Sequence, residues 1–333
     1  MSKKISILSI DGGGIRGIIP AVILEHIEQN LQKKTRNQNV RLADYFDMIA
    51  GTSTGGILTC FYLHPSRLPA EKAVKLYTNN GKKIFKSKFS LLNCVSSLFI
   101  AKYSEKGLET ALNDALGDCK LSQVSKHSLI TAYDIVKRES VFFTVPEAQK
   151  KPDESDIYLK DVARATSAAP TYFKPASVKV GNQLHSLIDG GMFANDPSLC
   201  AMVEARKTDF EKHKHPTIKN LYIVSVGTGK ISQPFDPKKA SNWGIAGWAS
   251  PVIDILTMAS PEVVSYQLKQ LFDVAGCSDY YMRLEPELCK ASPAMDDITD
   301  KNIENLKDAG NQYIKQNKEK LDKIVDELLL VSD

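Results

Sequence analysis

The 333-residue chain lacks the patterns that identify metal-binding, secreted and membrane-spanning proteins. Its six cysteines form no C-x-x-C pair and no zinc-ligand spacing, which predicts reduced thiols and no bound metal. No apolar run approaches the roughly 20 residues of a membrane span. Residues 1–5 lead directly into an apolar strand and leave no room for a signal peptide, so we expect a cytoplasmic protein. A leaderless export route would leave no mark in the sequence.

Signals for nucleotide and nucleic-acid binding are equally sparse. The net charge is only +4, which gives no support to a nucleic-acid partner. No G-x-x-x-x-G-K-[ST] segment occurs, so a P-loop is not expected. Residues 12–17 do fit G-x-G-x-x-G, but Asp11 would put a carboxylate beside a bound pyrophosphate, and no acidic strand end follows at the ribose-binding distance. A nucleotide-binding regulatory module is therefore the weaker interpretation of this loop.

Residues 51–55, Gly-Thr-Ser-Thr-Gly, connect an apolar segment to a predicted helix. A serine in a sharp strand-to-helix turn has a strained backbone and an exposed hydroxyl, and glycine two residues to either side avoids crowding. The positive end of the following helix favours a developing anion. We therefore predict Ser53 as a nucleophile, with Gly51 and Gly55 completing a nucleophile elbow.

A second motif, residues 11–17 (Asp-Gly-Gly-Gly-Ile-Arg-Gly), lies between the first predicted strand and the first predicted helix. Three successive glycines leave their N–H groups free to converge on an anion. In a hydrolase that anion would be the oxygen of a tetrahedral intermediate. We predict an oxyanion hole at Gly12, Gly13 and Gly14, with Arg16 as a supporting charge.

The third motif is Asp189, which ends a short apolar strand and precedes two glycines. A serine-hydrolase triad would also need a histidine, yet none of the six histidines has a motif or position that suggests catalysis. His185, on the same strand, lies about 13 Å from Asp189 along that strand. The sequence favours a Ser–Asp dyad in which Asp189 accepts the proton of Ser53, and this role needs a carboxylate made more basic by burial.

In this order, the segments 11–17, 51–56 and 189–191 resemble the patatin-like phospholipase family. Residues 42–47 and 163–173 are similar to the same family, and the likeness covers about residues 4–229. The resemblance implies a modified α/β-hydrolase fold, a Ser53–Asp189 dyad, an oxyanion hole in the glycine loop and no cofactor. It also implies calcium-independent, phospholipase A type hydrolysis of acyl esters in phospholipids or galactolipids. A soluble carboxylesterase or thioesterase is the alternative enzyme.

Strands and helices alternate along the chain, which predicts an α/β fold: a mostly parallel central sheet with helices on both faces, in three layers. We expect a single domain over residues 1–333, with an amphipathic helix or helix pair at 300–330 packing on the body. The predicted helices are residues 18–34, 54–63, 70–85, 106–116, 160–167 and 197–207. The predicted strands are residues 4–10, 128–136, 141–144, 186–189 and 221–226.

The expected partner is membrane or micellar lipid, contacted peripherally. Two segments are candidates for a lipid-facing rim: the apolar residues 91–100, and Trp243 and Trp248 in a predicted loop over 227–251. Both segments would equally suit the protein interior, where most apolar residues lie. The sequence contains no recognisable site for a protein or small-molecule activator.

Overall fold

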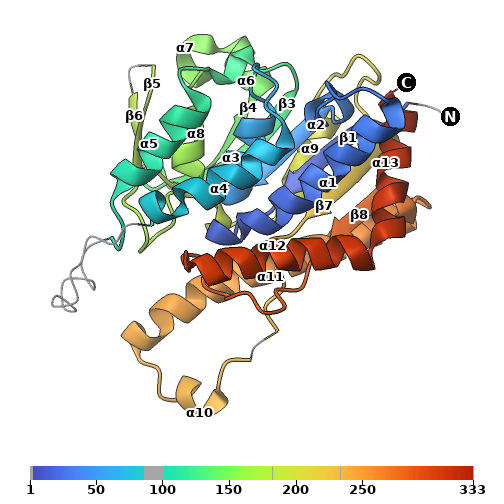
Figure 1. Ribbon diagram of the computed structural model, residues 1–333. Helices are drawn as coiled ribbons and strands as arrows, with labels where there is room; N and C mark the ends of the chain where they lie inside the picture. The colour runs from blue at the N-terminus through green and yellow to red at the C-terminus, as the bar shows by residue number, and fades with distance from the viewer. Residues whose placement is uncertain (1–2, 86–100, 182, 233, 333) are drawn as a thin grey trace.

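The computed structural model describes residues 3–85, 101–181, 183–232 and 234–332. Its centre is an eight-stranded sheet in the order β5-β6-β3-β2-β1-β7-β8, with β4 also paired to β3 (Figure 1). The pairs among β1, β2, β3, β7 and β8 are parallel, whereas those that include β4, β5 or β6 are antiparallel. The strands are β1 (Ile5–Ile10), β2 (Met48–Thr52), β3 (His127–Asp134), β4 (Glu139–Thr144), β5 (Ala176–Val180), β6 (Gln183–Asp189), β7 (Leu221–Val226) and β8 (Tyr281–Leu284).

Helices cover both faces of the sheet, as predicted. Successive residues of a strand point to opposite faces, and in β1 Leu8 and Ile10 enter one hydrophobic core while Ile5 and Ile7 enter another. Helices α1, α3, α4, α5, α8, α12 and α13 contribute to the first core, and α9 and α11 to the second. The predicted three-layer α/β fold is confirmed.

The helices have the following bounds: α1 (Ile18–Thr35), α2 (Leu42–Tyr45), α3 (Thr54–Tyr62), α4 (Ala70–Ile84), α5 (Glu105–Leu116), α6 (Val145–Lys150), α7 (Pro152–Ser155), α8 (Leu159–Thr166), α9 (Ser198–Lys207), α10 (Pro237–Ala240), α11 (Ile245–Val274), α12 (Asp300–Gln316) and α13 (Lys318–Ser332). Within the described residues, none of these helices is long and apolar enough to cross a membrane. The C-terminal pair α12 and α13 packs against α1, in agreement with the amphipathic pattern at 300–330.

Helix α11 is the main departure from the predicted elements. The sequence predicted a loop over residues 227–251, but α11 begins at Ile245, so Trp248 lies in a helix. Pro251 and Pro261 lie inside α11, and proline normally interrupts a helix, which is why the pattern indicated no helix here. The other candidate rim segment, residues 91–100, lies outside the described residues.

The ends of β2 and β6 meet on one edge of β3. Strand β4 pairs with residues 129–134 of β3 and so occupies the opposite edge. On the shared edge, Thr52 at the end of β2 pairs with Thr131, and Asp189 at the end of β6 pairs with Ala132. Because β2 is parallel and β6 antiparallel to β3, the two strands run towards each other. The sheet itself therefore brings Ser53, which follows Thr52, next to Asp189.

Candidate active site

Ser53 occupies the turn between β2 and α3 in a strained backbone conformation. Its φ of 54° and ψ of −122° lie where residues with side chains are rarely found. A Cβ added to Gly51 would lie 2.2 Å from the carbonyl oxygen of Gly55, and one added to Gly55 would lie 2.0 Å from that of Ile10. Glycine is therefore required at both positions, and the turn has the geometry of a nucleophile elbow.

Asp189 is buried beside Ser53. The Gly191 N–H donates a hydrogen bond to Asp189 Oδ1 at 2.8 Å, and the Ser53 side chain lies beside the same carboxylate. Burial raises the pKa of Asp189 to about 7, although Ser53 and the Gly191 N–H act to lower it. A carboxylate with this pKa is basic enough to take a proton near neutral pH.

Hydrogen bonds from neighbouring residues to its backbone carbonyl groups hold the glycine loop in place. The carbonyl oxygen of Gly12 accepts from Thr228 Oγ1 at 2.7 Å and from Asn195 Nδ2 at 3.4 Å. A trans peptide places its C=O and N–H on opposite sides, so these contacts turn the N–H of Gly13 the other way. The N–H of Gly12 itself donates to the Asn195 carbonyl at 3.1 Å, and is therefore not available to an external anion.

Arg16 fixes the next peptide in the same manner. Its Nε and its backbone N–H donate to the carbonyl oxygen of Gly13 at 3.3 and 3.2 Å, which turns the N–H of Gly14 away from Arg16. Gly13 and Gly14 line the same pocket as Ser53, and within the described residues their N–H groups have no acceptor. Arg16 is buried behind the loop and does not line the pocket. Burial lowers the pKa of its guanidinium, and Asp254 partly opposes this effect.

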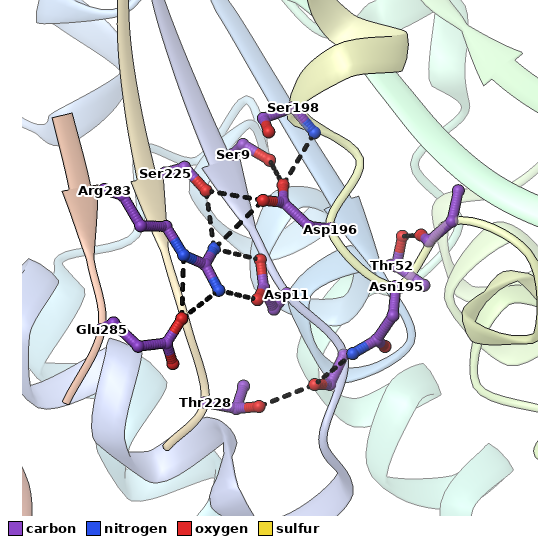
Figure 2. A network of polar contacts seen from close by, with 12 residues as sticks. Ser9, Asp11, Thr52, Asn195, Asp196, Ser198, Ser225, Thr228, Arg283 and Glu285 are labelled. Atoms are coloured by element: carbon purple, nitrogen blue, oxygen red, sulfur yellow. Dashed lines mark hydrogen bonds and ion pairs between the residues drawn. The ribbon is translucent and has the colours of Figure 1, made fainter. Parts of the chain in front are cut away.

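A buried ionic network supports the loop from beneath (Figure 2). Arg283 on β8 donates to both carboxylate oxygens of Asp11, at 2.9 and 2.6 Å, and to Asp196 at 3.2 Å. Its Nε also donates to Glu285 at 2.9 Å. Burial acts to lower the pKa of Arg283, but the three carboxylates together raise it well above its usual value. One cation thus joins the start of the glycine loop at Asp11 to the segment that carries Asn195.

The pocket beside Ser53 is mainly apolar. It encloses about 830 Å³, open solvent at its mouth included. Its walls include Ile57, Ile84, Phe85, Leu108, Phe173 and Ile253. No lysine, arginine or histidine occurs among its lining residues in the described part of the chain. Such walls suit an acyl chain, whereas a phosphate chain would find no countercharge there.

No histidine lines this pocket within the described residues, in agreement with the sequence. His185 Nδ1 forms a hydrogen bond with Asp134 Oδ2 at 2.8 Å, and His213 Nε2 contacts the backbone carbonyl of Lys3. Among the described residues that line the pocket, Asp189 is the only one with a carboxylate or imidazole side chain.

Thr166 lies in the segment 163–173 that resembles the family, and its Oγ1 accepts the N–H of Ser53 at 2.8 Å. Three other residues that shape the site were not found from the sequence: Asn195, Thr228 and Arg283. Thr228 follows the end of β7, and polar residues beyond the carboxyl ends of parallel strands commonly face a ligand site; this was the usable signal. Arg283 offered none, because its partner Asp11 lies 272 residues earlier.

Comparisons with known proteins place this geometry in context. A family model described as "Patatin-like phospholipase" matches residues 8–201. "Patatin-like protein 4" of Arabidopsis thaliana is 35% identical, over 94% of this chain and 84% of that protein. "Probable inactive patatin-3-Kuras 1" of Solanum tuberosum is 34% identical, over 95% of this chain and 88% of that protein. Among solved structures, VipD from Legionella pneumophila has a TM-score of 0.37 and 13% identity, over 95% of this chain and 67% of that one.

Proposed function

Because the chain belongs to the patatin-like phospholipase family, we propose that it is a lipid acyl hydrolase of the phospholipase A type, acting through a Ser53–Asp189 dyad without calcium. The observation that carries the proposal is that Ser53 lies beside a buried Asp189 whose pKa is raised to about 7, with both residues in the lining of one pocket. A proposed nucleophile and its proposed base are thereby neighbours in a mainly apolar pocket.

The reaction follows from this arrangement. Ser53 Oγ attacks the acyl carbonyl carbon while Asp189 takes its proton, and the N–H groups of Gly13 and Gly14 stabilise the oxyanion. Asp189 then returns the proton to the departing alcohol oxygen, which leaves as a lysolipid. A water molecule deprotonated by Asp189 attacks the acyl-enzyme, and Asp189 then returns that proton to Ser53 Oγ as the ester bond breaks and the fatty acid is released. The N–H of Gly12 is engaged with Asn195, so the proposed oxyanion hole comprises Gly13 and Gly14 alone.

Arg16, Asn195 and Thr228 are positioning residues in this scheme. They hold the two loop carbonyls and so aim the N–H groups before substrate binds, and preorganised donors stabilise a developing charge without reorganisation. These dipoles stabilise the charge on the acyl oxygen, the task a calcium ion performs in a metal-dependent hydrolase. A calcium ion is therefore not needed to stabilise this charge, which supports calcium independence.

The rival interpretation of the glycine loop as a nucleotide site is less well supported. Asp11 is ion-paired with Arg283, and the pocket lining contains no basic side chain within the described residues. A soluble ester or thioester could undergo the same chemistry. The two substrate classes are therefore distinguished by comparing hydrolysis of an ester in a membrane or micelle with hydrolysis of a dissolved ester.

The proposal predicts that fatty acid is released from phospholipid vesicles equally well with excess chelator and with added calcium.

A long-chain alkyl fluorophosphonate should also modify one serine, identified as Ser53 by peptide mass spectrometry, because only an activated hydroxyl attacks the phosphorus. Ser167, whose hydroxyl also lines the pocket but donates to the Ala163 carbonyl, should remain unmodified. Labelling elsewhere, or release that requires calcium, would contradict the proposal. Hydrolysis of short soluble esters alone would favour the carboxylesterase.

A further inference from the structure

Helix α11 has two unlike faces. On one face, Leu268 and Phe272 are fully buried in the core shared with α9, and the Thr257 carbonyl accepts a hydrogen bond from Asn195 Nδ2 at 2.7 Å. The other face carries exposed apolar side chains. We call these the α11 stripe: Ile245, Trp248, Val252, Ile255, Leu256, Val263 and Tyr266.

The α11 stripe is continuous. Its members follow one another mostly at intervals of three or four residues, which places them on one side of a helix that turns about 100° per residue. From Ile245 to Tyr266 the stripe is about 32 Å long at 1.5 Å per residue. More than half of the exposed large apolar side chains in the described residues lie on α11 or shortly before it. Contiguous apolar surface of this kind marks an interaction site.

The N-terminal end of the stripe combines aromatic and basic residues. The rings of Trp243 and Trp248 lie edge to face at 5.0 Å, and Phe235 contacts Trp243 at 5.7 Å. Lysines at 238 and 239 on α10 are exposed, and α10 with the first turns of α11 projects from the body (Figure 1). Tryptophan favours the headgroup level of a bilayer, and lysine is attracted to anionic lipid.

The same helix also reaches the active site. Ile253 and Thr257 line the pocket that contains Ser53, and on the helix they lie beside the stripe. A surface that covered the stripe would therefore adjoin the pocket. This continuity and the exposed lysines both favour a lipid surface over other occupants.

We propose that α10 and the α11 stripe form the surface by which this protein docks on an anionic phospholipid membrane, so that an acyl chain passes from the bilayer into the pocket beside Ser53. The role of this surface in supplying substrate rests on the proposed function, but binding to the membrane does not itself require hydrolysis. The C-terminal part of the helix stays packed on α9 and the sheet through Leu268 and Phe272, so the helix lies along the membrane surface and does not enter it end on.

The test uses the Ser53→Ala protein, so that vesicles stay intact and binding is measured without hydrolysis. Trp248 belongs to this surface and the chain's other tryptophan, Trp243, packs against it between α10 and α11, so a blue shift of intrinsic fluorescence on adding phosphatidylcholine–phosphatidylglycerol vesicles reports docking. We expect this shift, together with co-sedimentation that weakens at high salt. Leu256→Asp and Ile255→Asp should each weaken partitioning about tenfold or more, because a carboxylate then enters the interface.

Matched controls separate the surface from general effects. Val203→Asp changes an exposed valine on α9 outside the stripe and should leave partitioning unchanged. Lys238→Glu with Lys239→Glu should weaken binding to anionic vesicles about tenfold or more, whereas Lys150→Glu with Lys179→Glu, on α6 and β5 at the opposite end of the view, should not. With Ser53 present, Leu256→Asp should hydrolyse a short soluble ester at the wild-type rate.

Two results would overturn the docking proposal while leaving the proposed function standing. One is vesicle binding that Leu256→Asp and the α10 lysine variants do not change. The other is a dimer, detected by sedimentation velocity without lipid, that Leu256→Asp dissociates, since the stripe would then be an interface between two copies of the chain. Failure of the wild type to release fatty acid from phospholipid, whether in vesicles or in micelles, would instead contradict the proposed function.

Discussion

Asp189→Asn is expected to lower kcat for ester hydrolysis at pH 8 by about 10²- to 10⁴-fold, because an amide cannot accept the proton of Ser53. Ser53→Ala should remove at least as much, since no acyl-enzyme can form. The double variant should be no worse than Ser53→Ala alone, because residues that act as one unit lose their function together. Initial rates at matched folded concentration test this expectation.

Two matched variants make the dyad prediction specific. Ser167→Ala removes another hydroxyl of the same pocket, and Asp134→Asn changes a second buried carboxylate on β3 that bonds to His185. Both should keep most of the wild-type kcat. A loss in either control as large as that in Asp189→Asn would show that the site tolerates no nearby change, and would remove the argument for a dyad.

The proposed dyad also predicts how hydrolysis depends on pH. Burial raises the pKa of Asp189 to about 7, and the base must be ionised before it can take a proton. In the wild type, kcat/KM should therefore be level above pH 7 and fall about tenfold per pH unit below it. A profile that stayed flat down to pH 5 would mean that Asp189 has an ordinary pKa and is not the titrating base.

Arg283→Met should have the largest effect on stability, about 3–5 kcal/mol in the free energy of unfolding. The substitution keeps an unbranched but shorter side chain, and it leaves Asp11 and Asp196 buried without their cation. Burial already raises the pKa of Asp11, and Arg283 opposes this, so in the variant the pKa rises further. The variant's deficit should therefore shrink as the pH is lowered and the carboxylates take up protons. Urea unfolding at pH 8 and pH 5 measures both effects.

The control for Arg283→Met is Arg67→Met. Arg67 also forms two hydrogen bonds with one carboxylate, to both oxygens of Asp44 at 2.7 Å, but it is exposed. Water screens such a pair, and its loss should cost about 1 kcal/mol or less. Equal costs for the two variants would show that burial of the network around Arg283 contributes nothing to its importance.

Sequence reasoning succeeded where a motif specifies its own local geometry. The need for glycine at positions 51 and 55 follows from sterics within one turn, and the structure shows the close approaches that impose it. The strand pattern before Asp189 and the helical periodicity at 300–330 were equally local. The assignment of Ser53 and Asp189 to one site needed the family resemblance, because no pattern within either segment indicates that they meet.

The parts that could not be predicted depend on distant contacts. The engagement of the Gly12 N–H with Asn195 joins segments 183 residues apart, so the sequence could not distinguish Gly12 from Gly13 and Gly14 as a donor. Helix α11 forms despite Pro251 and Pro261 because Leu268 and Phe272 are held in the core. In that case packing overrides the local preference of the backbone.

The meeting of β2 and β6 on one edge of β3 has a consequence for heat tolerance. A triad whose histidine sits on a loop can lose its alignment while the rest of the protein remains folded. Here Thr52, which precedes the proposed nucleophile Ser53, and the proposed base Asp189 are both held by ladder pairs to consecutive residues of one strand. The two would then separate only when the sheet itself opens. Catalytic alignment should therefore persist on heating up to the temperature at which the whole molecule unfolds.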